Sequence, residues 1–132
     1  MRIKYLSKDP NWKQRLEDLG YGYHTDGENP YWIDDYYFSI SNQEADNIYN
    51  VSAELWQMCL QAVEHVITNN LYDQFKIPLS IRYHIEKSWN NDVPSIYGRF
   101  DFALDQKSGH LKLLEFNADT PTSLFECGSV QW

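Results

Sequence analysis

Two stretches of alternating side chains in the last third of the chain most constrain how it can fold. They are residues 95–104 (SIYGRFDFAL) and 110–118 (HLKLLEFNA), and the turn-forming sequence 105–109 (DQKSG) separates them. Alternation of apolar and polar residues on both sides of a short polar loop is typical of a β-hairpin. The sequence therefore predicts an antiparallel hairpin whose two faces differ in chemistry.

The register of this hairpin decides which side chains share a face. A five-residue loop would pair Arg99 with Glu115 and Asp101 with Leu113. The polar face would then carry Arg99, Asp101, Glu115 and Asn117, and the apolar face Phe100, Phe102, Leu104, Leu114 and Phe116. A slip of one residue would destroy this separation, because successive side chains of a strand point to opposite faces.

The predicted polar face holds the donor types of a magnesium site. The carboxylates of Asp101 and Glu115 and the amide oxygen of Asn117 are hard ligands that suit Mg²⁺. They are too few to enclose an ion, which favours an ion shared with a nucleotide. Arg99 adds a guanidinium that can hold a carboxylate or a phosphate through two hydrogen bonds.

Two other interpretations of the same face remain open. A surface hairpin with a cross-strand ion pair between Arg99 and Glu115 would place the same charges there without any ligand. A hydrolase could use Asp101 and Glu115 as an acid/base pair, and independence from Mg²⁺ would favour it.

The segment after the hairpin, residues 119–126 (DTPTSLFE), has the pattern of a helix start. Thr120 is the expected N-cap and Pro121 the first helical residue. Free backbone N–H groups and the hydroxyls of Thr122 and Ser123 would form an anion pocket there. Because this segment follows the second strand closely, a carboxylate held in the pocket would lie near the metal.

Helices are predicted elsewhere in the chain. Residues 41–44 (SNQE) fit a capping box, and the apolar residues that follow recur at steps of three and four up to Asn69, which predicts a long amphipathic helix facing the core. A short helix is expected from Asp9, as N-cap, to Gly20. Residues 79–89 fit a helix or a strand.

Irregular structure is predicted between the short helix and the long one. Residues 26–30 (DGENP) predict a turn, and residues 32–38 a short strand or irregular segment.

Composition narrows the class of protein. The 11 basic and 19 acidic residues give a net charge of −8, spread along the chain, which argues against binding to nucleic acid or an anionic membrane. Neither Cys59 nor Cys127 belongs to a CxxC motif, and no apolar run is long enough to span a bilayer, so a cytoplasmic protein is expected. A length of 132 residues favours a single domain.

Residues 97–102 (YGRFDF) and 114–123 (LEFNADTPTS) resemble the signature of the glutathionylspermidine synthase family, an ATP-grasp group. Weaker likeness upstream extends the resemblance over most of the chain. The family uses Mg²⁺ and ATP to activate the glycine carboxylate of glutathione as an acyl phosphate, which the amine of spermidine attacks. The resemblance therefore implies a peptide-like acid and a polyamine-type amine as small-molecule partners.

The resemblance also assigns roles to individual residues. Asp101, Glu115 and Asn117 would be the Mg²⁺ ligands, and Arg99 would act both in catalysis and in binding the substrate carboxylate. The substrate-binding hydroxyls are expected at Thr120, Thr122 and Ser123. The best-known members have Ser where this chain has Thr120 and Thr122, which leaves the acyl substrate open.

The family's synthetase domain is much longer than 132 residues, and its nucleotide-binding lysines would lie beyond Trp132. We therefore expect residues 1–132 to form a single α+β unit, a partial pre-ATP-grasp/ATP-grasp synthetase domain. It would be the N-terminal fragment of a carboxylate–amine ligase, inactive alone. The alternative is a non-catalytic module that self-associates or docks on a partner through the long helix and exposed aromatic side chains.

Overall fold

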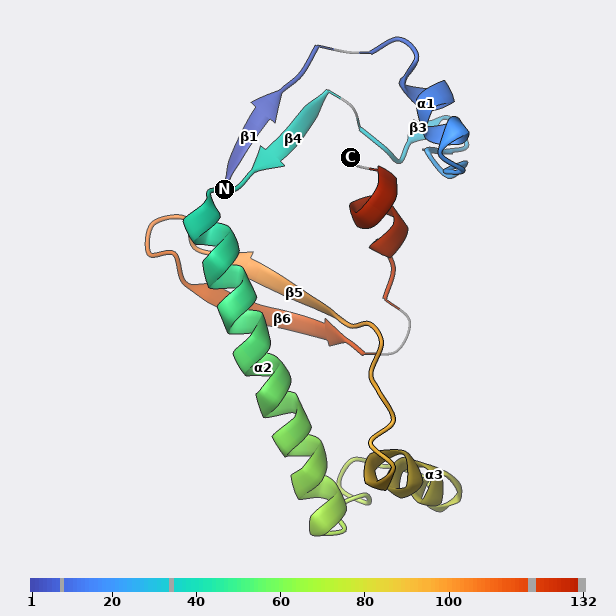
Figure 1. The fold of residues 1–132 in the computed structure, drawn as a ribbon, viewed down its shortest axis with the longest axis vertical. Helices are drawn as coiled ribbons and strands as arrows, with labels where there is room; N and C mark the ends of the chain where they lie inside the picture. The colour runs from blue at the N-terminus through green and yellow to red at the C-terminus, as the bar shows by residue number, and fades with distance from the viewer. Residues whose placement is uncertain (8, 34, 119–120, 131–132) are drawn as a thin grey trace.

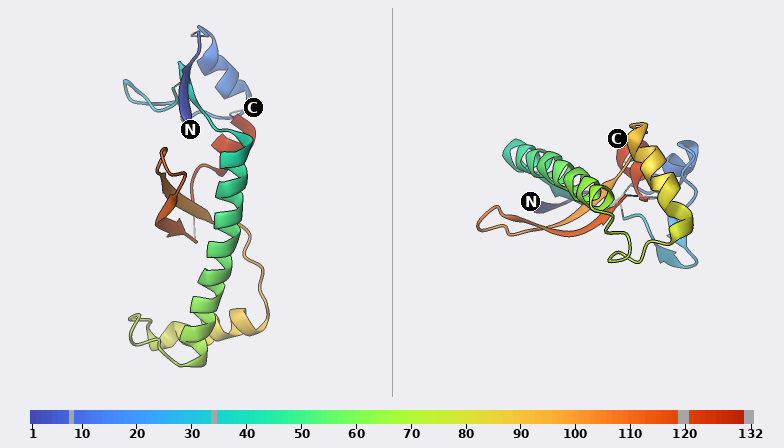
Figure 2. Two further views of the ribbon diagram at one scale, coloured as in Figure 1. Left: turned by 90° about the vertical axis from the view of Figure 1, so that its left-hand side faces the viewer. Right: turned by 90° about the horizontal axis from the view of Figure 1, so that it is seen from below.

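The computed structural model describes residues 1–7, 9–33, 35–118 and 121–130. One long helix, α2 (Asn42–Thr68), follows the long axis of the molecule below the N-terminal strands, and the hairpin of β5 (Arg99–Leu104) and β6 (Leu111–Asn117) lies against its N-terminal half (Figures 1 and 2). The two strands are antiparallel. The predicted α+β class, with a long helix packed on an antiparallel hairpin, is confirmed.

The start of α2 is fixed by the predicted capping box. The hydroxyl of Ser41 accepts the backbone N–H of Glu44 at 3.2 Å, and the carboxylate of Glu44 accepts the backbone N–H of Ser41 at 2.7 Å. The last helical residue is Thr68, Asn69 is the C-cap, and Asn70 has a φ of 51°. A left-handed residue cannot continue a right-handed helix, so both predicted ends of α2 are confirmed.

Replacing Ser41 by Ala is expected to lower the free energy of unfolding by about 1 kcal/mol, because the first turn of α2 loses a side-chain acceptor. Urea denaturation followed by circular dichroism would measure the loss. Ser80→Ala is the matched control, since Ser80 lies in the first turn of α3 (Leu79–Asn90), whose N-cap makes no side-chain hydrogen bond. Equal losses in the two variants would contradict a capping role for Ser41.

The apolar stripe of α2 is only half-buried. Ile48, Leu55, Trp56 and Cys59 are partly covered, and the Trp56 ring meets Phe116 of β6 edge to face at 6.0 Å. No described residue of α2 is fully buried, so the expectation of a core along this helix is wrong. The reason is size, because a helix of 27 residues is roughly 40 Å long and a two-stranded hairpin covers only part of it.

The buried cluster lies instead near the ends of the chain. Leu16, Tyr21 and Val130 are each 6% exposed, and Trp12 and Trp32 pack against them. This cluster joins α1 (Trp12–Asp18) to the π-helical segment η1 (Glu126–Val130), which lies more than a hundred residues later in the sequence. Nothing in the local pattern of either segment indicates the contact.

The ambiguous residues 79–89 are helical, and form most of α3. The turn between α2 and α3 buries Tyr72, whose hydroxyl donates to Glu86 at 2.9 Å. Burial, together with this hydrogen bond, raises the pKa of Tyr72. Arg82 donates to the backbone oxygen of Ile77 and pairs with Asp73, so α3 is anchored to the turn that precedes it.

Two small strand pairs complete the structure. β1 (Arg2–Tyr5) pairs with β4 (Tyr36–Ser39), and β2 (Thr25–Asp26) pairs with β3 (Asn29–Pro30). The turn between β2 and β3 is the predicted one, with Gly27 at a φ of 59°. β4 falls on the segment predicted as strand or irregular, whereas no sequence signal marked β1.

The short helix α1 begins later than predicted. Its N-cap is Asn11, not Asp9, and Pro10 lies in the preceding turn. The carboxylate of Asp9 accepts the backbone N–H of Asn11 at 2.9 Å and the guanidinium of Arg15 at 2.9 Å. Asp9 therefore closes a turn before the helix, and Gly20, at a φ of 85°, follows the end of the helix as predicted.

In the described ranges, no helix combines the length and the apolar character needed to cross a bilayer.

A candidate metal and anion site on the hairpin

The register of the hairpin differs from the predicted one by two residues. Arg99 lies opposite Asn117, and Asp101 lies opposite Glu115. The predicted pairs, Arg99 with Glu115 and Asp101 with Leu113, are therefore wrong. A shift of two leaves the alternation of faces unchanged, because side chains repeat every second residue. The structure accordingly brings the four predicted polar side chains together on one face, with the two carboxylates directly across from each other.

A β-bulge interrupts the hairpin between Asp101 and Phe102. Beyond it Phe102 pairs with Leu113 and Leu104 with Leu111, which leaves Leu114 as the extra residue of β6 and lengthens the loop to residues 105–110. The predicted place of Leu114 in the apolar layer is not kept, since its side chain is 68% exposed. A bulge leaves its extra residue unpaired, bends the strand that carries it and increases the local twist.

The aromatic part of the apolar face is as predicted, whereas Leu113, predicted opposite Asp101, pairs with Phe102. The ring of Phe100 stacks on Phe116 at a centroid distance of 4.3 Å and on Phe102 at 6.0 Å. Trp56 of α2 meets the same Phe116 ring. These aromatic contacts attach the hairpin to the helix and leave its polar face directed away from the aromatic layer.

Arg99 and Asp101 form a bidentate pair on one strand. Arg99 Nε donates to Asp101 Oδ1 at 2.8 Å, and Nη2 donates to Oδ2 at 3.2 Å. Both side chains are about one-third exposed, at 32% and 36%. The hydrogen bond to Asp101 raises the pKa of Arg99, and the nearby charges of Asp101 and Glu115 act in the same direction. One guanidinium therefore offsets part of the negative charge of the two facing carboxylates, and it is bonded to Asp101.

Arg99 also reaches the segment that follows β6. Its Nη1 donates to Thr122 Oγ1 at 3.0 Å and to the backbone oxygen of Thr122 at 3.3 Å. The adjacent Ser123 is half-buried and has a φ of 79°. The guanidinium thus joins the polar face of the hairpin to Thr122, one of the predicted substrate-binding residues.

The predicted helix start at Pro121 is wrong. Pro121, Thr122 and Ser123 lie outside any helix, and helical residues begin at Leu124. The left-handed backbone of Ser123 cannot belong to a right-handed helix. The backbone oxygen of Thr122 accepts a hydrogen bond from Arg99 instead of from a helical N–H group. The proposed N-cap, Thr120, lies outside the described residues, so its role as a substrate-binding residue stays a prediction.

Asn117 supplies an unsatisfied polar atom at this site. Its Nδ2 is buried and has no hydrogen-bond partner. The nitrogen and oxygen of an amide exchange places by a half-turn of the group, and their assignment rests on the surrounding partners. A half-turn would put the amide oxygen in the unpartnered position, where a cation or a donor on a ligand would satisfy it.

The donors do not by themselves form a closed metal site. Within the described residues no three His, Cys, Asp or Glu side chains are grouped so that they could hold a metal ion. Two carboxylates and one amide would give a partial shell. Such a set fits a hard cation completed by water and substrate oxygens and does not fit a structural ion.

Comparison with known proteins identifies the family. The model of the glutathionylspermidine synthase pre-ATP-grasp family matches residues 3–132, nearly the whole chain. The chain belongs to the glutathionylspermidine synthase pre-ATP-grasp family. The resemblance inferred from residues 97–102 and 114–123 is thereby confirmed, and it extends well beyond them.

Three curated relatives of this pre-ATP-grasp chain are named as a ligase, a synthase and a synthetase. It is 38% identical to a Haemophilus influenzae protein named "Putative acid--amine ligase", over 99% of the chain and 34% of the relative. It is 29% identical to the glutathionylspermidine synthase of Crithidia fasciculata, over 86% of the chain and 16% of that protein. It is 40% identical to the trypanothione synthetase of the same organism over 57 residues, which are 43% of the chain and 9% of that protein. The chain thus spans about a third of the length of the first relative and less of the others.

Proposed function

We propose that this chain contributes part of the active site of an ATP-dependent acid–amine ligase, supplying groups for Mg²⁺ and for the substrate carboxylate. The observation that carries the proposal is the gathering of Arg99, Asp101, Glu115 and Asn117 on one face of the hairpin, with Thr122 bonded to Arg99. The family match and the names of the relatives support the same class of reaction.

Under this proposal the substrate carboxylate is activated by transfer of the γ-phosphoryl group of ATP, with ADP as the leaving group. Catalysis of this step depends on positioning and on neutralising negative charge. Arg99 would hold the substrate carboxylate and the transferring phosphoryl group through its planar fork. The hydroxyls of Thr122 and Ser123, and that of Thr120, would orient the acyl substrate beside it.

Asp101, Glu115 and Asn117 would hold the magnesium ion, which neutralises phosphate charge when ATP is bound. Arg99 now occupies both oxygens of Asp101. Arg99 would therefore give up Asp101 when the ion binds, and its guanidinium would become free for the substrate anion. Under this proposal the Arg99–Asp101 ion pair exists only in the unliganded protein, and Mg²⁺ takes the place of Arg99 at Asp101 when it binds.

Titration with Mn²⁺, a paramagnetic stand-in for Mg²⁺, tests the metal ligands. We expect selective broadening of the NMR signals of residues 99–101 and 115–117. Asp101→Asn and Glu115→Gln should each weaken Mn²⁺ binding at least about tenfold, since even outer-shell partners of a metal typically change affinity by that factor. Glu64→Gln on α2, an exposed carboxylate outside the site, is the charge-matched control. Equal weakening in all three variants would reject the assignment.

The 132-residue chain alone is expected to release no phosphate from ATP with glutathione and spermidine present, because the groups found here form only part of a site. Steady phosphate release above the protein-free rate, lost in Arg99→Ala, would show that the site is complete and would overturn the partial-site proposal.

A second function is favoured by the exposed apolar surface. On α2 and α3, the side chains of Tyr49, Met58, Leu79 and Tyr83 are between 55% and 80% exposed. Exposed apolar side chains that form a large patch on a monomer commonly mark an interface. A non-catalytic module would use this surface to associate with itself or a partner. Sedimentation over a hundredfold concentration range would detect dimers, and a monomer that binds no hydrophobic dye would exclude this function.

A further inference from the structure

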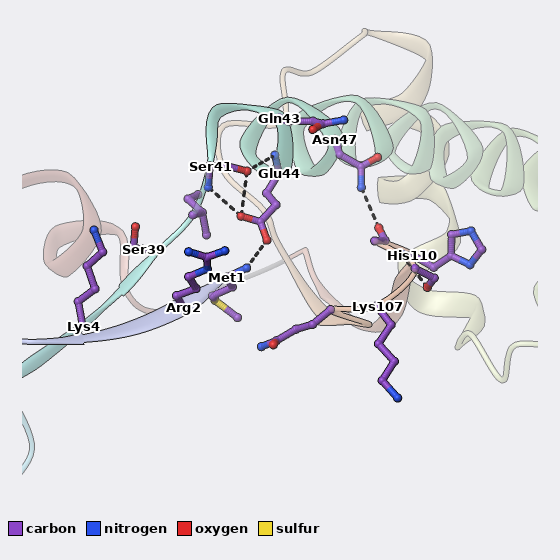
Figure 3. Close-up of a pocket in the computed structure, with 14 residues that line it drawn as sticks. Met1, Arg2, Lys4, Ser39, Ser41, Gln43, Glu44, Asn47, Lys107 and His110 are labelled. Carbon is purple, nitrogen blue, oxygen red and sulfur yellow. Dashed lines mark hydrogen bonds and ion pairs between the residues drawn. The ribbon is translucent and has the colours of Figure 1, made fainter.

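A cleft of about 820 Å³ lies at the tip of the β5–β6 hairpin, where three segments far apart in the sequence meet (Figure 3). The start of β1, the start of α2 and the loop 105–110 form its walls. The side chains that line it include Arg2, Lys4, Glu44, Asn47, Lys107 and His110. The length of β5, roughly 20 Å, separates this loop from Arg99, so the cleft is distinct from the site proposed above.

The cleft is positively charged in an acidic chain. Arg2, Lys4 and Lys107 line it, against one lining carboxylate, Glu44, among the described residues, whereas the whole chain has a net charge of −8. Within the described part of the chain, none of these three cationic side chains has a carboxylate within 4.0 Å. A cleft lined by one sign of charge concentrates the opposite ion.

The single carboxylate does not balance these cations, because it has donors of its own. Glu44 pairs with the terminal ammonium group of Met1 and accepts hydrogen bonds from the backbone N–H and the hydroxyl of Ser41. These donors, with the ammonium group first, lower the pKa of Glu44 to about 2. The positive charge of Arg2, Lys4 and Lys107 is therefore available to a ligand.

The walls of the cleft are held in place by hydrogen bonds. Asn47 Nδ2 of α2 donates to the backbone oxygen of Gly109 at 3.1 Å, and Asp105 Oδ1 accepts the backbone N–H of Lys107 at 3.0 Å. Arg2 and Lys4 are two apart on β1 and rise from the same side of that strand in Figure 3. Lys107 extends outward from the loop, and its flexible four-carbon stem can turn its ammonium group toward a ligand.

We propose that this cleft binds a small anion that carries a diphosphate or triphosphate group. Such a group places several negative charges within a few ångströms, which matches several separate cations, whereas a single carboxylate matches only one. The guanidinium of Arg2 suits two phosphate oxygens at once, and the lysines act as point charges. Hydroxyls of Ser39 and Ser108 also line the cleft and can donate to the same oxygens.

Pyrophosphate and tripolyphosphate are the probes, added to the 132-residue chain in buffer that contains EDTA. The absence of divalent cations keeps the result independent of the proposed metal site. In ¹H–¹⁵N spectra we expect saturable shifts at Arg2, Asn47 and Gly109 and none at Arg99. Binding should weaken with added salt, and tripolyphosphate should bind more tightly than pyrophosphate.

Substitutions inside and outside the cleft distinguish binding at this site from nonspecific attraction of the polyphosphate to surface cations. Arg2→Gln and Lys107→Gln should each weaken tripolyphosphate binding about three- to tenfold, the range between an exposed ion pair and a charge-assisted hydrogen bond. Lys87→Gln on α3, at the far end of the molecule, should change it less than about twofold. Circular dichroism of each variant confirms that it keeps its helices.

Three results would overturn the proposal: shifts that do not saturate, equal weakening by Lys87→Gln, or citrate binding as tightly as tripolyphosphate. Comparison of ADP with pyrophosphate then identifies the source of the phosphate group. Tighter binding of ADP supports a nucleotide ligand, and equal binding supports recognition of the diphosphate alone.

Discussion

Replacing Gly98 by Ala is expected to destabilise the protein by about 1–3 kcal/mol, the usual cost of adding a methyl group to a packed contact. A Cβ at this position would lie 2.8 Å from Phe116 Cε2 and 3.2 Å from Phe116 Cζ. The ring cannot move away freely, since Phe100 stacks on it and Trp56 of α2 meets it. The substitution would therefore disturb the contact that attaches the hairpin to the long helix.

Urea denaturation followed by tryptophan fluorescence would measure this effect. Gly22→Ala is the matched control, because a Cβ there meets nothing within 4 Å and Gly22 does not have a positive φ. We expect Gly22→Ala to leave the midpoint nearly unchanged or to raise it slightly, since Ala reduces the entropy of the unfolded chain. Equal midpoints for the two variants would show that the Phe116 ring yields without cost.

The hairpin shows how much of a site can be predicted from sequence. Alternation alone placed Arg99, Asp101, Glu115 and Asn117 on one face, and this survived an error of two residues in the register because the side-chain repeat is two. The direct partners of each residue were not predictable. They depend on the six-residue loop and on the bulge at Leu114, which the alternating pattern does not mark.

Arg99 was predicted to lie opposite Glu115, and an ion pair between the two was one interpretation left open. In the structure Arg99 instead forms its ion pair with Asp101, two residues along its own strand. Opposite charges two residues apart on a strand lie on one side and can meet, so the YGRFDF sequence contained this signal. The positive cleft was not predictable in the same way. Arg2, Lys4 and Lys107 are scattered in the sequence, and only the packing of β1, α2 and the loop brings them together.

Helix ends that depend on local sequence were predicted, and helix ends that depend on longer-range side-chain contacts were not. The capping box at Ser41 and the end of the apolar periodicity at Asn69 are local signals, and they predicted both ends of α2 correctly. The starts of α1 and of the last helical segment were misplaced, because Asp9 bonds to Arg15 and Thr122 bonds to Arg99. Arg15 belongs to α1 and Arg99 to β5, and in each case a guanidinium holds a residue that the cap rules place at the start of the helix.

Replacing Arg99 by Ala is expected to change metal binding and ligase activity in opposite directions. Removing the guanidinium leaves Asp101 and Glu115 facing each other without a counter-charge. Mn²⁺ affinity should rise about fivefold, since one unit charge at 4 Å in water contributes about 1 kcal/mol. In a ligase that contains this chain together with the rest of the active site, turnover should fall by about 10²–10³. This is the usual loss when one hydrogen-bond donor to a developing negative charge is removed.

Arg99→Lys separates charge from geometry in the same experiment. It keeps one positive charge, so Mn²⁺ affinity should remain near that of the unchanged protein, but it lacks the fork that bonds to both Asp101 oxygens and to Thr122, so turnover should stay low. Stability provides a further readout, because Mn²⁺ should raise the unfolding midpoint of Arg99→Ala more than that of the unchanged protein. If Arg99 serves only as a surface ion pair, its removal lowers stability equally with and without Mn²⁺, and the proposed exchange of counter-ions is wrong.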